Sequence, residues 1–138
     1  MTKYNLEDQV GHLMRRANQR HAAIFFEGFH NQQLTPMQFA VLLKIGDEKE
    51  VSQNRLGRLA AMDPATVQGV VRRLKERALI NARPDPDDGR RSLWRLSETG
   101  RTLVTATIPI AEQITEQTLA PLSKSERSTF LYLLRKLA

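Results

Sequence analysis

Apolar residues recur at helical spacing in six stretches of the chain, and the longest stretch covers residues 5–31. At about 100° per residue, most of its apolar side chains fall on one face of a helix. The members of this stripe are Leu6, Val10, Leu13, Met14, Ala17, Ile24 and Phe25, with Phe26 and Phe29 beside it. A stripe this wide predicts a long N-terminal helix that packs against more than one partner.

Three shorter helices follow, and each opens with a residue that caps helix N-termini. The capping residues are Thr35 before Pro36, Ser52, and Asp63 before Pro64. Proline at the first helical position loses no hydrogen bond. We expect Gly46 to end the first of these helices and the third to cover residues 63–77. The residues expected to face inward are Leu56, Leu59 and Ala60 in the second helix and Val67, Val70, Val71 and Leu74 in the third.

Two strands are predicted next, at residues 79–83 and 90–96, because prolines and a glycine punctuate the segment between them. A short helix, a tight turn, a capped helix and a hairpin make up a winged helix-turn-helix, which lays one helix in the DNA major groove. The predicted fold class is therefore mainly α with a small β-wing, and the predicted DNA-binding lobe covers residues 35–96.

Two further helices are predicted at the C-terminal end. Ser97 caps one that runs to about Leu119, with a kink expected at Pro109. Ser123 and Glu126 have the spacing of a capping box, which opens the other.

The terminal segments, residues 1–31 and 97–138, carry more apolar surface than a winged helix needs. Self-association would bury it, so we expect these segments to form a dimerisation arm within a single chain of residues 1–138. Such a homodimer would present two recognition helices to a pseudo-palindromic DNA site, one helical turn apart. The alternative is that the end helices cover the core within one chain.

The positive charge is concentrated in the middle of the chain. The formal net charge is +6, and residues 55–95 hold ten Lys or Arg against five Asp or Glu. Phosphates attract such a segment by Coulomb steering and counterion release. The alternative is an ordinary charged surface that keeps the protein in solution.

The composition narrows the function classes. The chain has no cysteine, so disulfides, thiolate metal sites and cysteine nucleophiles are excluded. The N-terminus lacks an apolar signal core, and the longest nearly apolar run, residues 103–111, is too short to span a membrane. We expect a soluble cytoplasmic protein with no membrane partner, no cofactor and no metal.

Candidate DNA contacts lie on three predicted elements. Thr66 and Gln68 occupy the N-terminal part of helix 63–77, where a Gln suits the paired donor and acceptor of adenine. Asp88 has the spacing to orient an arginine through a charge-assisted bond. The remaining candidates are Arg72 and Arg73 for guanine or phosphate, Ser52, Asn54 and Arg55 for phosphate, and Arg90 and Arg91 for a narrow minor groove. The alternative for Arg72 and Arg73 is solvated helix charge, and for Asp88 an ordinary turn residue.

Four segments in this order resemble the MarR family of transcription regulators. They are Leu34-Thr35-Pro36-Met37-Gln38-Phe39, residues 56–74, Asp88-Gly89-Arg90 and Leu96-Ser97-Glu98-Thr99-Gly100. The resemblance implies a homodimeric repressor that binds a palindrome overlapping a promoter. It further implies release by a small ligand, often a phenolic or aromatic acid, in the cleft between arm and lobe. Residues 13–25 and 57–63 resemble members that control aromatic acid catabolism, some of which respond to the acid and others to its coenzyme A thioester.

His21 is the leading candidate for the effector. It lies within the apolar stripe near Met14 and Phe25, where a histidine needs a hydrogen-bond partner. It is either satisfied within the core or binds a phenol or carboxylate of the ligand. Arg15 lies about 120° around the helix, so the two would share a cavity only with the ligand between helices. Met37 and Phe39 are candidates for apolar walls.

Three other readings stay open. A metal sensor is disfavoured, because His21 points opposite to His12 and His30 on the predicted helix and those two lie roughly 27 Å apart along its axis. An enzyme is disfavoured, because no nucleophile motif, phosphate loop or catalytic carboxylate pair occurs. An architectural DNA-binding protein would keep the basic wing but lack a strong preference for one sequence.

Overall fold

The computed structural model describes residues 3–138. The chain divides into two compact units, Phe29–Ile108 and the combination of Met1–Gly28 with Pro109–Ala138. The first of these is called the winged unit and the second the arm unit below. One helix, α5 (Glu98–Leu119), contributes to both.

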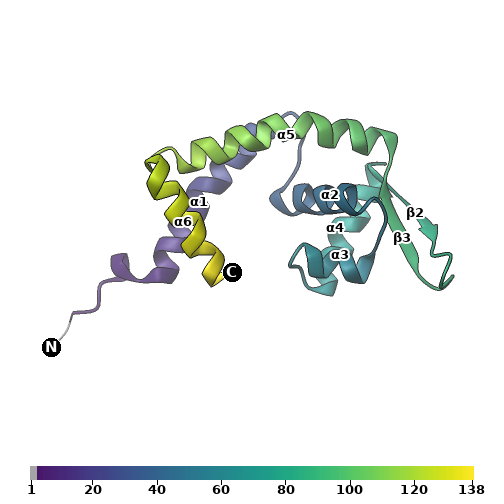
Figure 1. Cartoon of the computed structure of the whole chain (residues 1–138), viewed down its shortest axis with the longest axis horizontal. Helices are drawn as coiled ribbons and strands as arrows, with labels where there is room; N and C mark the ends of the chain where they lie inside the picture. The colour runs from purple at the N-terminus through teal and green to yellow at the C-terminus, as the bar shows by residue number, and fades with distance from the viewer. Residues whose placement is uncertain (1–2) are drawn as a thin grey trace. The chain divides into compact units, whose positions relative to one another are not determined.

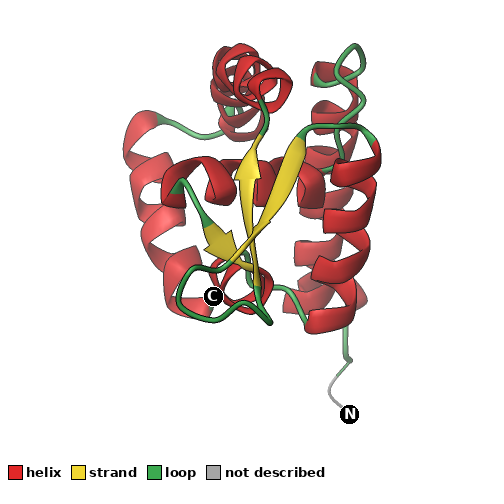
Figure 2. Cartoon of the chain, turned by 90° about the vertical axis from the view of Figure 1, so that its right-hand side faces the viewer, coloured by secondary structure: helices red, strands yellow, loops and turns green. Residues whose placement is uncertain are grey.

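The winged unit contains three helices and a three-stranded antiparallel sheet (Figures 1 and 2). In chain order its elements are α2 (Pro36–Glu48), β1 (Val51–Ser52), α3 (Gln53–Leu59), α4 (Pro64–Glu76), β2 (Ile80–Pro84) and β3 (Ser92–Leu96), followed by the first part of α5. The strand order is β1-β3-β2, with Ile80 opposite Leu96 and Val51 opposite Trp94. This arrangement confirms the predicted winged helix-turn-helix and fold class, and the predicted lobe of residues 35–96 lies within it.

The predicted caps account for where these helices begin. The Thr35 hydroxyl accepts from the Gln38 amide at 3.1 Å in a capping box. Ser52 and Asp63 accept in the same way from amides three residues later. Each cap satisfies a backbone donor that the first turn of a helix leaves without a partner.

The core of the winged unit lies between the helices and one face of the sheet. All four residues predicted to face inward on α4 are buried. Buried in the same unit are Leu56 of α3, Ile45 of α2 and, from the sheet, Ile80, Trp94 and Leu96. Alternation along β3 places Leu93 and Arg95 on the opposite, outer face. The residues that recur with a helical period in α4 and with a period of two in β3 therefore contribute to one apolar core.

The arm unit consists of α1 (Val10–Gly28), the second part of α5 and α6 (Lys124–Leu137). The Arg20 guanidinium donates to the carbonyls of Gln117 and Thr118, at 2.8 and 2.7 Å. Gly28 lies so near Ile114 that a Cβ there would be 2.8 Å from its Cδ1. Large apolar side chains remain exposed along α1 and α6, namely Val10, Leu13, Met14, Phe26, Phe130, Tyr132, Leu133, Leu134 and Leu137.

Some predicted boundaries were wrong. The helix expected at residues 5–31 is divided into a 3-10 turn (Leu6–Asp8) and α1. The division falls at Gln9, whose backbone is extended and whose side chain accepts from the His12 amide at 2.7 Å. Gly46 does not end α2, which continues to Glu48. Lys49 then takes a positive φ (φ 66°, ψ −52°), and the Glu50 amide donates to the Glu48 carbonyl at 2.8 Å in a γ-turn around Lys49.

The wing also differs in detail from the prediction. Strand β3 begins at Ser92 rather than residue 90, because residues 85–91 form the turn. Strand β1, only two residues long, was missed, since its pairing with β3 depends on residues about 40 positions away.

Candidate nucleic-acid interface

The recognition surface predicted on α4 is exposed along one side of the helix. Gln68, Arg72 and Arg73 are exposed, whereas the apolar residues between them are buried. Thr66 is partly buried, and its hydroxyl donates to the Asp63 carboxylate at 2.9 Å. The pKa of Asp63 is lowered by the Thr66 amide and then by this hydroxyl. Gly69 faces open space, since a Cβ there would come no nearer than 4.0 Å to Arg73.

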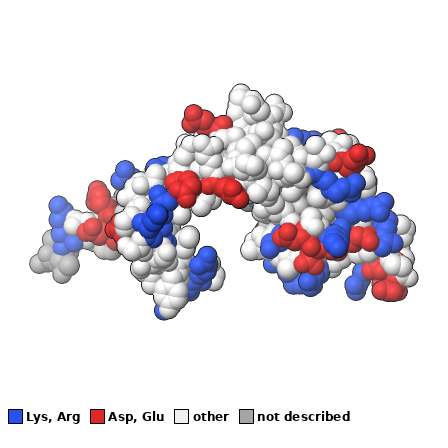
Figure 3. Space-filling view, turned by 45° about the horizontal axis from the view of Figure 1, so that its top comes forward, with Lys and Arg blue, Asp and Glu red and all other residues white. Residues whose placement is uncertain are grey.

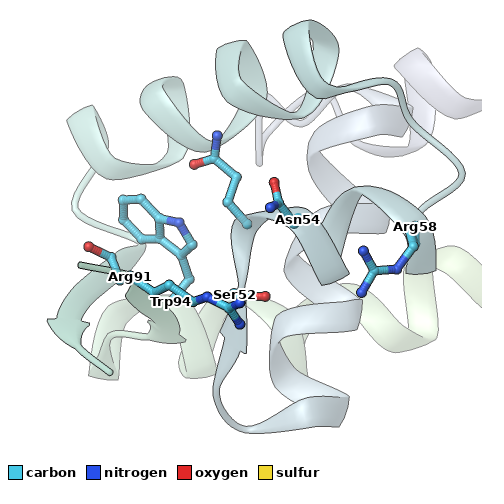
Figure 4. A pocket seen from close by; sticks show the side chains of 7 residues that line it. Ser52, Asn54, Arg58, Arg91 and Trp94 are labelled. Atoms are coloured by element: carbon cyan, nitrogen blue, oxygen red, sulfur yellow. The ribbon is translucent and has the colours of Figure 1, made fainter. Parts of the chain in front are cut away.

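The start of α3 and the wing enclose a groove of about 430 Å³ (Figure 4). Asn54 and Arg58 extend from α3 on one side, and Trp94 lies on the wing side. The groove is lined by Ser52, Gln53, Asn54, Arg58, Arg91, Ser92 and Trp94. Three of these, Ser52, Asn54 and Arg91, were predicted from sequence and are brought together here.

Arg58 was missed as a candidate for DNA contact. It lies four residues after Asn54, and residues at that spacing share one face of a helix. Arg55 points to a different partner, since its guanidinium lies 3.3 Å from Glu48 Oε2. The spacing of Asn54 and Arg58 was the signal that could have found Arg58.

The wing tip is organised by Asp88. One of its oxygens accepts from the Arg90 amide at 3.1 Å and from Arg90 Nε at 3.2 Å. Its other oxygen lies 3.7 Å from Arg91 Nε. The pKa of Asp88 is lowered by the Arg90 amide, then by the Arg90 side chain and the charge of Arg91. The side chains of Arg90 and Arg91 remain 92% and 67% exposed, so both guanidinium groups are accessible to a partner.

An ion pair between Arg83 of β2 and Glu50, the residue before β1, links the two sides of the sheet across β3. Arg83 Nη2 donates to Glu50 Oε1 at 2.6 Å, and Arg83 Nε donates to the other oxygen. This pair lowers the pKa of Glu50, with a smaller contribution from Arg95. Beside it, a second groove of about 310 Å³ is lined by Ile45, Gly46, Lys49, Glu50, Arg95, Leu96 and Arg101.

Basic residues are mixed with acidic ones over the winged unit (Figure 3). Around the groove of Figure 4, Arg58 and Arg91 are the charged lining residues. A groove with cationic and amide walls suits a phosphate backbone, and the exposed arginines of the wing suit a narrow groove of DNA.

The residues predicted to bind the effector are divided between the units. In the arm unit, His21 Nδ1 lies 2.9 Å from Thr118 Oγ1, and its ring centre lies 6.2 Å from that of Phe25. Arg15 Nη2 lies 3.0 Å from His12 Nδ1, and Met14 is exposed. In the winged unit, Met37 is exposed and Phe39 packs on Phe29. Neither groove described above is lined by these residues, and the ligand site stays a prediction.

Two features that residues 3–138 lack bear on other functions. No three His, Asp or Glu side chains of these residues lie close enough together to hold a metal ion. None of the helices in this part of the chain has the length and apolarity to cross a membrane.

Comparisons with known proteins agree with the geometry of the winged unit. A family model described as the MarR family matches residues 32–91. The chain is 45% identical over 136 residues to the HTH-type transcriptional repressor NicR of Pseudomonas putida, covering 99% of this chain and 86% of that protein.

Two solved structures are similar over nearly their full length. One is a probable transcriptional regulator from Pseudomonas aeruginosa, with a TM-score of 0.94 and 49% identity over 97% of this chain and 100% of that one. The other is BpsR of Bordetella bronchiseptica, whose DNA binding is regulated by 6-hydroxynicotinic acid. Its TM-score is 0.93, with 44% identity over 99% of this chain and 97% of that one.

Proposed function

The chain belongs to the MarR family of transcription regulators, and we propose that it is a homodimeric repressor that binds a pseudo-palindromic operator. A small aromatic carboxylate releases it from the DNA. The observation that carries this proposal is the placement of exposed α4 side chains and two carboxylate-held wing arginines in one compact unit. We place its action on DNA in the cytoplasm.

In this proposal each element of the winged unit contacts a different part of the DNA. Gln68 and Thr66 contact base edges in the major groove, with Arg72 and Arg73 on guanine or phosphate. Arg90 and Arg91, ordered by Asp88, enter the flanking minor groove. The groove at the start of α3 receives backbone phosphate, with Ser52 and Asn54 from the prediction and Arg58 added from the structure. Arg55, which does not line this groove and pairs with Glu48 in the free chain, is kept as a further phosphate contact.

The dimer is supported by the arm unit. Its exposed apolar side chains include Leu13 and Met14 on α1 and Leu133 and Leu137 on α6, each at least half exposed in the single chain. Several large apolar side chains left exposed in one unit mark an association site. In a two-fold dimer the apolar patch of one chain packs against the same patch of the other chain. The two winged units then bind the two halves of a symmetric site.

The effector class is supported by the relative BpsR, whose DNA binding responds to 6-hydroxynicotinic acid. A hydroxylated ring carboxylate offers an apolar face, an anion and a hydrogen-bonding ring substituent. We assign His21 and Arg15 to its polar groups and Met14, Phe25, Met37 and Phe39 to its apolar surround. The coenzyme A thioester of such an acid is the second candidate ligand.

Footprinting on the DNA upstream of the protein's own gene tests the proposal. We expect protection of a symmetric site at physiological salt against excess random DNA, and loss of protection with 6-hydroxynicotinic acid or its coenzyme A thioester. Nicotinic acid, which lacks the hydroxyl, is the matched control. Equal affinity for random DNA would instead support an architectural role. A ligand recovered unchanged after incubation would separate a regulator from an enzyme.

Variants of the arm unit test the ligand site. His21→Ala and Arg15→Ala should keep the operator affinity of the parent but require more ligand for release. A release curve identical to that of the parent in both variants would contradict the assignment.

A further inference from the structure

Arg77, directly after α4, donates side-chain hydrogen bonds to residues 39 to 45 positions away along the chain. It is the C-cap of the helix, at the end opposite to Thr66 and Gln68. Its Nη2 donates to the Gln32 carbonyl at 2.9 Å, and its Nη1 donates to the Gln33 carbonyl at 3.0 Å. A planar guanidinium with fixed donors suits this pair of acceptors, and a lysine ammonium has no equivalent fork.

The turn whose carbonyls accept from Arg77 is itself held by a backbone hydrogen bond and by buried side chains. The Gln33 amide donates to the Phe29 carbonyl at 2.9 Å, and Gln33 takes a left-handed conformation (φ 52°). Phe29 and Leu34, on either side of the two acceptors, are 1% and 2% exposed. Both side chains anchor the turn in the core, so its carbonyls form a fixed reference point.

The same arginine reaches the start of α2. Its Nη1 lies 3.5 Å from the Gln38 side-chain oxygen, which also accepts from the Thr35 amide in the capping box. Arg77 thus joins three elements: the end of α4, the turn at residues 29–33 and the first turn of α2. That turn is also where the chain passes from α1 into the winged unit.

The backbone after Arg77 leads directly to the wing. Ala78 has a left-handed conformation (φ 58°), and the Leu79 amide donates to the Leu74 carbonyl at 3.1 Å before β2 starts at Ile80. A shift at this end of α4 would therefore move both the recognition side chains and the root of the wing.

We propose that Arg77 is a positioning residue for operator binding, because its fork holds the C-terminal end of α4 to the carbonyls of residues 32 and 33. This inference rests on the proposed function. In the proposed role the guanidinium fixes the position of the helix end through hydrogen bonds within the protein and does not contact DNA phosphate. The competing role, a phosphate contact by an exposed cation, makes opposite predictions for the variants below.

The test compares Arg77→Lys and Arg77→Ala with the parent in operator titrations at several salt concentrations. If Arg77 positions α4, both variants lose about tenfold in affinity, because lysine keeps the charge but not the fork. The slope of log affinity against log salt then stays that of the parent. Arg73→Ala serves as the matched control, one turn earlier on the same helix, and should reduce the slope by about one.

Two results would overturn the inference. One is parent affinity in Arg77→Lys. The other is a slope reduced by about one in Arg77→Ala, since that marks a lost phosphate contact. Circular dichroism at the titration temperature verifies that the variants are folded, and hydrogen exchange should show faster exchange at residues 74–79 in Arg77→Lys. A parent protein without operator binding would refute the proposed function itself, whereas an unaffected Arg77→Lys refutes only the positioning role.

Discussion

Single side chains at the wing tip are ordered before any partner arrives. Asp88 bonds both the backbone and the side chain of Arg90 and pairs with Arg91. A side chain already held near its bound conformation loses less entropy on binding. The turn of the wing therefore orients Arg90 and Arg91 for the proposed minor-groove contact, and both side chains remain largely exposed.

Removing one of these cations should weaken binding to every DNA sequence. Arg90→Ala is expected to lower affinity for operator and random duplex alike and to reduce the salt slope by about one unit, because one phosphate-linked counterion fewer is released. Titrations at several salt concentrations measure both quantities. Arg16→Ala, the same charge loss on α1, should leave the slope unchanged, and an equal effect of the two variants would count against docking of the wing.

Gln68 should act differently, because it is predicted to read a base rather than a phosphate. Gln68→Ala is expected to change the preference at one base pair of each half-site by about 1–3 kcal/mol while keeping the salt slope. Affinities for operators substituted at each position in turn would reveal the changed position. Uniform weakening at all positions would assign Gln68 to a non-specific contact instead.

Side-chain interactions could be predicted from the sequence where the two partners are close along the chain. Capping by Ser52, Thr35 and Asp63, and the Asp88–Arg90 bond, span two or three residues and follow from spacing. The Arg83–Glu50 pair and the Arg77 contacts could not be predicted, because their partners are 33 to 45 residues away and only the folded chain brings them together.

The start of α5 packs so closely against the backbone before β2 that no side chain fits between them. A Cβ at Gly100, in the first turn of α5, would lie 2.1 Å from the Leu79 carbonyl oxygen, and the Ser97 hydroxyl that caps this turn also donates to the Ala78 carbonyl. Glycine is required here by the close approach of two backbones.

Two glycine substitutions should therefore have opposite effects on stability. Gly100→Ala should destabilise the fold by several kcal/mol, because backbone has to move. Gly69→Ala should stabilise the free protein by up to about 1 kcal/mol, because α4 is open there and alanine favours helix. Urea unfolding of both variants measures this. A tolerated Gly100→Ala would show that the junction of β2 and α5 is loose. Reduced operator affinity in Gly69→Ala would place that position close to DNA.

The wing should loosen in acid. The pKa of Glu50 is lowered by Arg83, so its ionised form stabilises the folded state above the unfolded pKa, and this contribution is lost as the pH falls through the lowered folded pKa. We expect Glu50→Gln to be less stable than the parent at pH 7 and the difference to shrink below about pH 5. Unfolding curves across this range test it, with Glu76→Gln as an exposed control. A difference that does not vary with pH would contradict this.

Most helices and both strands of the wing were predictable as elements because their signals are local. Periodicity identified the buried face of α4, and the capping residues identified where α2, α3 and α4 begin. The end of α2 was not predictable, because the turn that follows it is made by Lys49 and not by the expected Gly46. Strand β1 has two residues and exists only through its pairing with β3.

For the whole molecule, the exposed apolar surface of the arm unit is the main feature that the single chain does not explain. Leu133→Glu should convert the proposed dimer into a monomer and lower operator affinity by about 10²-fold or more, because the two half-sites are then bound independently. Sedimentation and operator titration measure the two effects. Ser128→Glu adds the same charge on a polar position of α6 and should change neither, and a dimeric Leu133→Glu protein would reject the arm as the interface.

The bond from the Thr66 hydroxyl to Asp63 has a consequence for the DNA code. Its proton is committed within the protein, so the hydroxyl offers only lone pairs to a base. It can then accept from the exocyclic amino group of adenine or cytosine, whereas the O6 of guanine and O4 of thymine present acceptors and are disfavoured. In a two-fold complex this restriction recurs at the symmetry-related position. Sites selected from a random pool should therefore carry adenine or cytosine on the contacted strand at one position of each half-site, and guanine or thymine should be rare on that strand there.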